Sequence, residues 1–275
     1  MPLDQPDDIR EESEMSFLDH LEALRWHLIR SVTVILVFMI LAFIYKNILF
    51  DRIILGPKNA DFPTYRFFCF ISEWLFNNDS ICIGEMKFNL INITMAGQFT
   101  THIMVSFFAG LVLAFPYVLW EVWRFIKPGL YAHERKHANG MVFYSSFLFV
   151  LGIGFGYFVI APLSVNFLGN YRVSEMIDNQ ISISSFMTTV VTTTFATGVV
   201  FQLPIVVYFL SRIGLITSRI LKVYRKASYV GILVLSAIIT PPDVTSQVIV
   251  ALPLFLLYEI SITISRAIEK KKATK

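Results

Sequence analysis

The sequence has 275 residues, of which 55% are hydrophobic and only 16% are charged. Soluble domains are typically about 45–50% apolar and about 25% charged, so this composition excludes an ordinary soluble fold. The formal net charge of +3 at pH 7 gives no indication of nucleic-acid binding. The apolar residues are gathered into long stretches with few charges, as the hydrocarbon core of a bilayer requires. The composition therefore predicts an all-α, multi-pass membrane protein.

The first 15 residues are polar and acidic, and we expect a disordered cytoplasmic tail there (residues 1–15) rather than a cleavable signal peptide. Residues 16–275 are predicted to form a single transmembrane domain. Ahead of the first span, apolar residues recur at helical spacing, which favours an interfacial amphipathic helix. These residues are Phe17, Leu21, Leu24 and Leu28.

Six apolar stretches are predicted to span the membrane. They cover residues 31–50, 99–123, 141–163, 186–210, 227–239 and 244–265. At about 1.5 Å per residue the fifth stretch is only about 20 Å long, against roughly 30 Å of hydrocarbon. The fifth span is therefore expected to be too short for an unperturbed bilayer and to thin the bilayer beside it.

The distribution of positive charge predicts the orientation. Most of the 23 Lys and Arg residues fall on the side of the N-terminus when the six spans alternate in direction. Under the positive-inside rule, both ends of the chain are then expected in the cytoplasm.

Residues 51–98 form the one long loop on the other side, and we expect an external cap at the membrane interface. Aromatic rings favour the headgroup region, and the loop carries a patch of six of them between residues 65 and 76. They are Tyr65, Phe67, Phe68, Phe70, Trp74 and Phe76. The two cysteines, Cys69 and Cys82, lie in this loop; they are too few for a metal site, while a single disulfide is possible.

Small and hydroxylated residues mark two of the spans. Gly152, Gly154 and Gly156 are expected to let another helix approach the third span closely. The fourth span is rich in threonine and carries Gln202 and Pro204. Its polar side chains are expected to bond to backbone carbonyls or to a neighbouring helix.

No nucleophile–base pair, phosphate loop or metal-ligand spacing is visible, so neither an enzyme nor a metal or cofactor site is expected. The ionisable groups lie instead at predicted membrane edges, where helix-end ion pairing and snorkelling would account for them. They include Glu22 beside Arg25, Glu121 near Arg124, Glu134 beside Arg135, and Glu259 ahead of Arg266.

Six segments, in order along the chain, carry a family resemblance. They are His20–Leu28 (HLEALRWHL), Phe115–Arg135, Gly156–Leu163, Phe201–Leu210, Thr240–Gln247 (TPPDVTSQ) and Ala251–Ile262. Together they resemble the TatC family, the polytopic receptor subunit of the twin-arginine protein translocase. The resemblance covers nearly the whole chain after residue 15 but is weak over residues 51–92.

The resemblance implies a concave bundle of six transmembrane helices in the bacterial inner membrane, with both termini cytoplasmic and two short final helices. It implies binding of the twin-arginine signal peptides of folded precursors at the cytoplasmic face and nucleation of translocon assembly. The implied partners are small single-span subunits of the TatA and TatB type, further copies of this chain and the lipid bilayer. The implied driving force is the proton-motive force, with no cofactor.

The family's motifs also imply site residues. The signal-peptide site would include Glu22, Arg25, Phe125 and Glu134, because two adjacent guanidinium forks need more than one carboxylate acceptor. Gln202 and Asp243 would be intramembrane polar or partner-binding residues, although Asp after two prolines is also ordinary turn chemistry.

Two positions depart from the family's pattern. The usual glutamate two residues before Arg25 is replaced by Ala23, and Glu22 lies one position earlier, about 100° around a helix. Gln202 stands where a glutamate is common, and an amide cannot ionise.

Two other classes remain open. An ion-coupled secondary transporter of a small solute would need a polar cavity at the membrane midplane, often with an ionisable residue. A purely structural membrane scaffold would leave the carboxylates at the membrane edge without a task.

Overall fold

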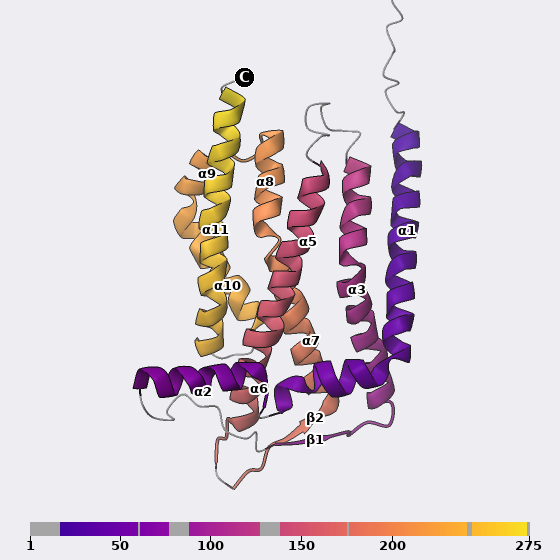
Figure 1. Cartoon of the computed structure of the whole chain (residues 1–275), viewed down its shortest axis with the longest axis vertical. Helices are drawn as coiled ribbons and strands as arrows, with labels where there is room; N and C mark the ends of the chain where they lie inside the picture. The colour runs from indigo at the N-terminus through magenta and orange to yellow at the C-terminus, as the bar shows by residue number, and fades with distance from the viewer. Residues whose placement is uncertain are drawn as a thin grey trace, which may run out of the picture.

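The structure is a computed structural model and describes residues 17–59, 61–76, 88–126, 138–174, 176–240 and 244–273. The described chain is mostly helical, with long helices running side by side (Figure 1). We call the end where α1 begins and α11 ends the upper end, and the opposite end the lower end. The long helices are α1 (Phe17–Ile44), α3 (Gly97–Ile126), α5 (Ala138–Phe155), α7 (Ile183–Val200), α8 (Leu203–Ile213), α10 (Arg225–Ile239) and α11 (Val244–Ala273).

Shorter elements continue or connect these helices. A π-helical turn η4 (Gly156–Ile160) and helix α6 (Ala161–Asn170) extend α5 at the lower end. The six-residue α9 (Ser218–Val223) precedes α10. The long loop contains η1 (Ile48–Ile54), η2 (Gly56–Lys58), α2 (Pro63–Phe76) and strand β1 (Asn89–Ile91), while β2 (Gln180–Ser182) precedes α7.

Within the described residues, five stretches are long and apolar enough to cross a membrane. They are Leu21–Ile44, Gly97–Ile126, Gly140–Asn170, Ile183–Ile213 and Ser246–Lys270. The remaining expected span corresponds to α10, which has 15 residues and is about 22 Å long. The predicted shortness of this helix therefore agrees with the structure, while the count of six spans stays a prediction. The second short final helix that the resemblance implied is wrong, because α11 continues for 30 residues from Val244 to Ala273.

The observed helices differ from the predicted boundaries at three places. The first helix runs without interruption from Phe17 and ends at Ile44, where polar Lys46, Asn47 and Asp51 turn the chain into η1 rather than continuing the span. The third predicted span continues helically as far as Asn170. The fourth is broken after Val200, just before Pro204.

A two-stranded parallel sheet joins the two loops of the lower end and was not predicted. Asn89 pairs with Gln180 and Ile91 with Ser182. Strands of three residues leave little periodic signal in a sequence, because their pairing depends on how the two loops pack.

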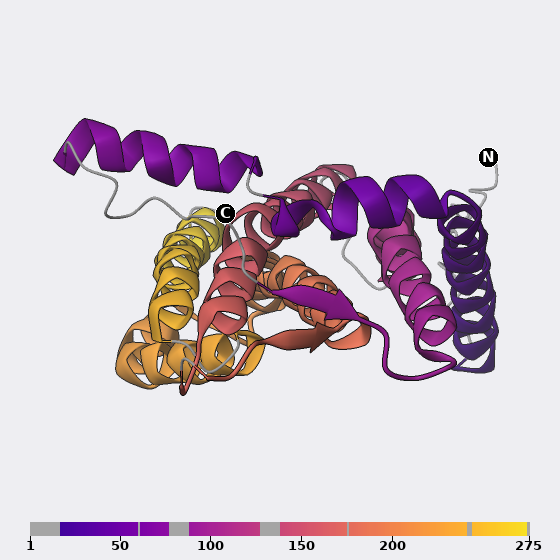
Figure 2. The same cartoon turned by 90° about the horizontal axis from the view of Figure 1, so that it is seen from below.

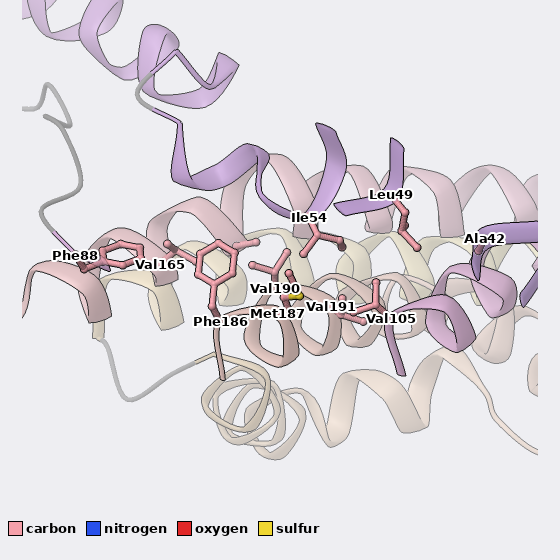
Figure 3. Close-up of a cluster of buried hydrophobic side chains, with 11 residues drawn as sticks. Ala42, Leu49, Ile54, Phe88, Val105, Val165, Phe186, Met187, Val190 and Val191 are labelled. Atoms are coloured by element: carbon pink, nitrogen blue, oxygen red, sulfur yellow. The ribbon is translucent and has the colours of Figure 1, made fainter. Parts of the chain in front are cut away.

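The lower end is closed by apolar packing under η1. In Figure 3, Leu49 and Ile54 of η1 point toward Val190 and Val191 of α7. Phe88, next to β1, belongs to the same cluster. Residues of the long loop are therefore part of the hydrophobic core. A second cluster lies where α10 and α11 pack, and includes Leu221, Ile232, Leu254 and Tyr258.

Glycines allow the closest helix contacts. An added Cβ at Gly152 would lie 2.9 Å from the Cα of Gly198, and one at Gly156 would lie 2.8 Å from the Cα of Thr194. The predicted close approach is thus confirmed for these two glycines, whereas Gly154 faces open space.

A close backbone contact between α1 and α3 makes Gly110 a position that should be sensitive to substitution. A Cβ at Gly110 would lie 2.8 Å from the backbone nitrogen of Met39 and 2.9 Å from the carbonyl oxygen of Ile35. Because both atoms are backbone, Gly110→Ala should push the two helices apart and lower stability by about 1–3 kcal/mol. Unfolding in detergent, followed by circular dichroism, measures this loss. Gly154→Ala is the matched control and should unfold like the wild type; equal behaviour of the two variants would contradict the prediction.

Candidate functional site

A buried carboxylate joins α1 to α3. Glu121 on α3 is only 1% exposed, and its Oε2 is bonded to Nδ1 of His27 on α1. The Tyr117 hydroxyl donates to Oε1 of the same carboxylate at 2.9 Å. A buried carboxylate that loses a hydrogen-bond partner is left desolvated and unsatisfied, so this contact strongly constrains how the two helices meet.

The sequence of α3 explains why Glu121 faces α1. Gly110, Ala114, Tyr117 and Glu121 are spaced by four, three and four residues, which places them on one helix face. Gly110 and Ala114 let α1 come close, and the same face then delivers Glu121 to His27 one to two turns further on. This spacing was the signal for the contact in the sequence; the prediction instead assigned Glu121 to helix-end pairing with Arg124.

The predicted residues of α1 lie beside this contact but face outward. Glu22 and Arg25 are exposed, whereas Ala23 is half-buried and shares a helix face with His27, four residues on. The one-residue displacement of the glutamate therefore places Glu22 on the exposed side of α1.

Phe125 is the predicted residue that the structure brings to the contact. Its ring lies edge-on to the His27 ring, with centroids 6.0 Å apart. Also on α3, the guanidinium of Arg124 lies 5.3 Å from the centre of the Trp120 ring. Glu134 and Asp243 lie outside the described residues.

Gln202 lies at the break between α7 and α8. Its Oε1 accepts from the Ser145 hydroxyl at 2.5 Å, and its Nε2 donates to the Ser145 carbonyl at 3.0 Å. Both ends of the amide are thus engaged by α5. The side chain bonds the interrupted helix to its neighbour, the interhelical bonding expected of polar groups in this span.

Carboxylates of α11 hold the α8–α10 connection in a similar way. Glu269 accepts hydrogen bonds from the backbone nitrogen of Ser218 at 2.6 Å and from its hydroxyl at 2.5 Å. Glu259 pairs with Arg225 and accepts from the Tyr229 hydroxyl at 2.6 Å. The partners are at least 30 residues apart in sequence, so no local spacing indicates them.

An apolar cavity of about 610 Å³ is lined by residues of α1, η1, α3, α5, η4 and α7. Its wall includes Phe38, Leu113, Val150 and Phe158, and nearly all of its lining is hydrocarbon. Such a surface suits an apolar helix or an acyl chain.

The fold and these contacts define a multi-pass α-helical membrane protein whose helices are tied by buried polar pairs. Residues 19–253 match the family model described as Sec-independent protein translocase protein (TatC). The chain therefore belongs to the TatC family of the Sec-independent protein translocase.

Individual relatives agree with this assignment. The TatC protein of Blattabacterium sp. subsp. Periplaneta americana is 37% identical over 95% of this chain and 99% of its own length. That of Deinococcus radiodurans is 33% identical over 90% of this chain and 84% of its own. A crystal structure of the twin arginine translocase receptor TatC in DDM superimposes with a TM-score of 0.69, at 32% identity, over 90% of this chain and 99% of that one.

The His27–Glu121 pair predicts an asymmetric stability effect. His27→Ala should destabilise the protein by about 3 kcal/mol, because the buried Glu121 carboxylate then loses its hydrogen-bond partner on α1. The double variant His27→Leu/Glu121→Leu should recover most of that loss, since it leaves no buried carboxylate without a partner. Denaturant unfolding in detergent measures the difference. Arg124→Ala, on the exposed side of α3, serves as control, and a double variant no more stable than His27→Ala would contradict the reasoning.

Proposed function

We propose that this chain is the receptor of a twin-arginine translocase, which binds the signal peptides of folded precursors at its cytoplasmic face and nucleates assembly of the translocon. The observation that carries the proposal is the His27–Glu121 contact. It ties the segment of α1 that bears Glu22 and Arg25 to the end of α3 that bears Phe125. In the sequence, α3 leads directly into residues 127–137, which contain Glu134.

The chemistry of recognition follows from the shape of arginine. A guanidinium presents a planar fork of donors that a carboxylate meets in a bidentate manner, and an ammonium does not reproduce this geometry. Glu134 and Glu22 are the carboxylates assigned to the two arginines. Because Glu22 is exposed on α1, a peptide would reach it from the aqueous side without disrupting the buried pair.

The proposed topology has six spans in the inner membrane, with α10 as the short fifth span and both termini in the cytoplasm. The lysines and arginines of residues 266–275 and 212–226 support this orientation under the positive-inside rule. The bound peptide's apolar segment would continue along the bundle, for which the 610 Å³ cavity offers an apolar wall.

The proposed partners are small single-span subunits of the TatA and TatB type, together with further copies of the chain. Gln202 and Asp243 are the assigned polar contacts within the membrane. Since the amide of Gln202 is already bonded to Ser145, a partner's polar side chain would bind there by exchanging with one of these bonds.

The proposal predicts that peptide binding depends on the arginine pair. A photo-crosslinkable signal peptide with two arginines should label the protein in inverted membrane vesicles, and a lysine–lysine peptide should label it at least about tenfold less, because one lost bidentate pair is worth over 1.4 kcal/mol. Glu134→Ala should weaken labelling likewise.

Glu73→Ala is the matched control, because Glu73 is an exposed carboxylate on α2 in the long loop. Equal labelling by the two peptides would refute the receptor assignment. Uptake of a small solute by proteoliposomes containing only this protein would favour the transporter class instead.

A further inference from the structure

Helix α2 leaves the bundle and lies across its lower end. Both views show it perpendicular to the long helices, and in Figure 2 most of its length extends beyond them. It belongs to residues 51–92, where the sequence resembles the TatC family least. No role of the proposed receptor needs this helix.

The beginning of α2 is fixed to the bundle. Tyr65 is 1% exposed, and its hydroxyl donates to the carbonyl oxygens of Pro57 at 2.6 Å and Pro162 at 3.3 Å. Burial raises the pKa of the Tyr65 phenol, so it stays a neutral donor. The Thr64 hydroxyl bonds to the Phe158 carbonyl, and the Phe62 ring stacks on that of Phe158. These contacts fix the first turn of α2 to the bundle, and we call this fixed segment, Phe62–Tyr65, the root of the helix.

Beyond this root, α2 exposes an aromatic stripe. Phe67, Phe70 and Trp74 are spaced by three and four residues and are 59%, 65% and 77% exposed. Ser72 lies on the opposite side and is fully buried. Three large rings on one face of a short helix are too much contiguous apolar surface to leave in water.

The charges of α2 are separated from the stripe. Arg66 and Glu73 are seven residues apart and so share a line along the helix, roughly a quarter turn from the aromatic residues. Arg66 pairs with Asp61 at 3.0 Å, and both side chains are exposed. A helix with rings on one side and charges on another is typical of segments that lie in the membrane interface.

The level of α2 in the molecule fits the same surface. Figure 1 shows α2 just below the lower ends of α10 and α11. Because α10 is about 22 Å long, a bilayer that matches it must bring its headgroups up to that end. A helix lying there meets the boundary between headgroups and acyl chains, where aromatic rings are favoured.

We propose that α2 is a lateral lipid anchor, whose stripe of Phe67, Phe70 and Trp74 inserts into the headgroup–acyl boundary of the leaflet at the lower end. The occupant of this apolar face is phospholipid, because α2 extends beyond the bundle at the level of the lower end of α10, where the headgroup region is expected and aromatic rings are favoured. The anchor holds the thinned bilayer against the α10–α11 side. It does not depend on the proposed receptor function.

The test uses the fluorescence of Trp74 in the full-length protein. The protein is placed, one copy per nanodisc, in phosphatidylethanolamine and phosphatidylglycerol. The emission of Trp74→Phe is subtracted from that of the wild type to isolate Trp74. Lipids brominated near the headgroup should quench this emission, while lipids brominated near the end of the acyl chain should leave the emission unchanged. The reason is that helices of this kind bury their apolar face only about 5–10 Å into the membrane interface.

Trp123 provides the matched control. It is 7% exposed within the bundle and packs edge-on against Phe209, so the emission isolated with Trp123→Phe should resist both lipids. The proposed lipid anchor is refuted if only aqueous acrylamide quenches the Trp74 emission, because this result places the stripe in water. It is also overturned if Trp74 resists all quenchers, which means that protein covers it, or if deep bromines quench it more strongly.

Discussion

Hydrocarbon offers no hydrogen-bond partner to a backbone, and this constraint shapes every part of the bundle. Helices satisfy their own donors and acceptors, which is why the crossing stretches are helical. The same solvent gives helices little hydrophobic reason to associate, so their contacts depend on small residues and polar pairs. Gly110, Gly152 and Gly156 provide the close approaches. The bonds between helices include Thr101 to Ser184 and Ser211 to Ser265, each at 2.9 Å.

The constraint also explains where the helices are irregular. The break before Pro204 frees backbone groups, and Gln202 lies beside it with both amide atoms bonded to Ser145. At the lower end, the Tyr157 hydroxyl of η4 donates to the carbonyl of Ile53 in η1 at 2.6 Å. Both irregular stretches therefore carry a side chain that bonds to a neighbouring element, and these bonds help to fix how the elements are arranged.

Periodic features of the fold could be predicted, whereas contacts between distant segments could not. The apolar stretches, the shortness of the fifth helix and the close approach at Gly152 and Gly156 follow from composition and spacing along one helix. The Glu269–Ser218 contact joins residues 51 positions apart, and the β1–β2 pairing depends on two loops meeting, so neither leaves a local pattern. Of the predicted site residues, Phe125 lies at the His27–Glu121 contact, while Glu22 faces away from it. The sequence contained the relevant signal in the face shared by Gly110, Ala114, Tyr117 and Glu121, but helix-end pairing explained Glu121 equally well.

The long loop shows why weak family resemblance need not mean a loose structure. Leu49, Ile54 and Phe88 are less than a tenth exposed and fill the core beneath η1 and β1, so both ends of the loop are integral to the fold. Cys69 of α2 is disulfide-bonded, while Cys82 lies outside the described residues. Between these fixed ends, the chain builds a helix that turns its largest rings outward. A loop that merely closed the bundle would bury Phe67, Phe70 and Trp74 with the rest. Their exposure on a rigidly rooted helix means that the surface to which they bind lies outside this chain.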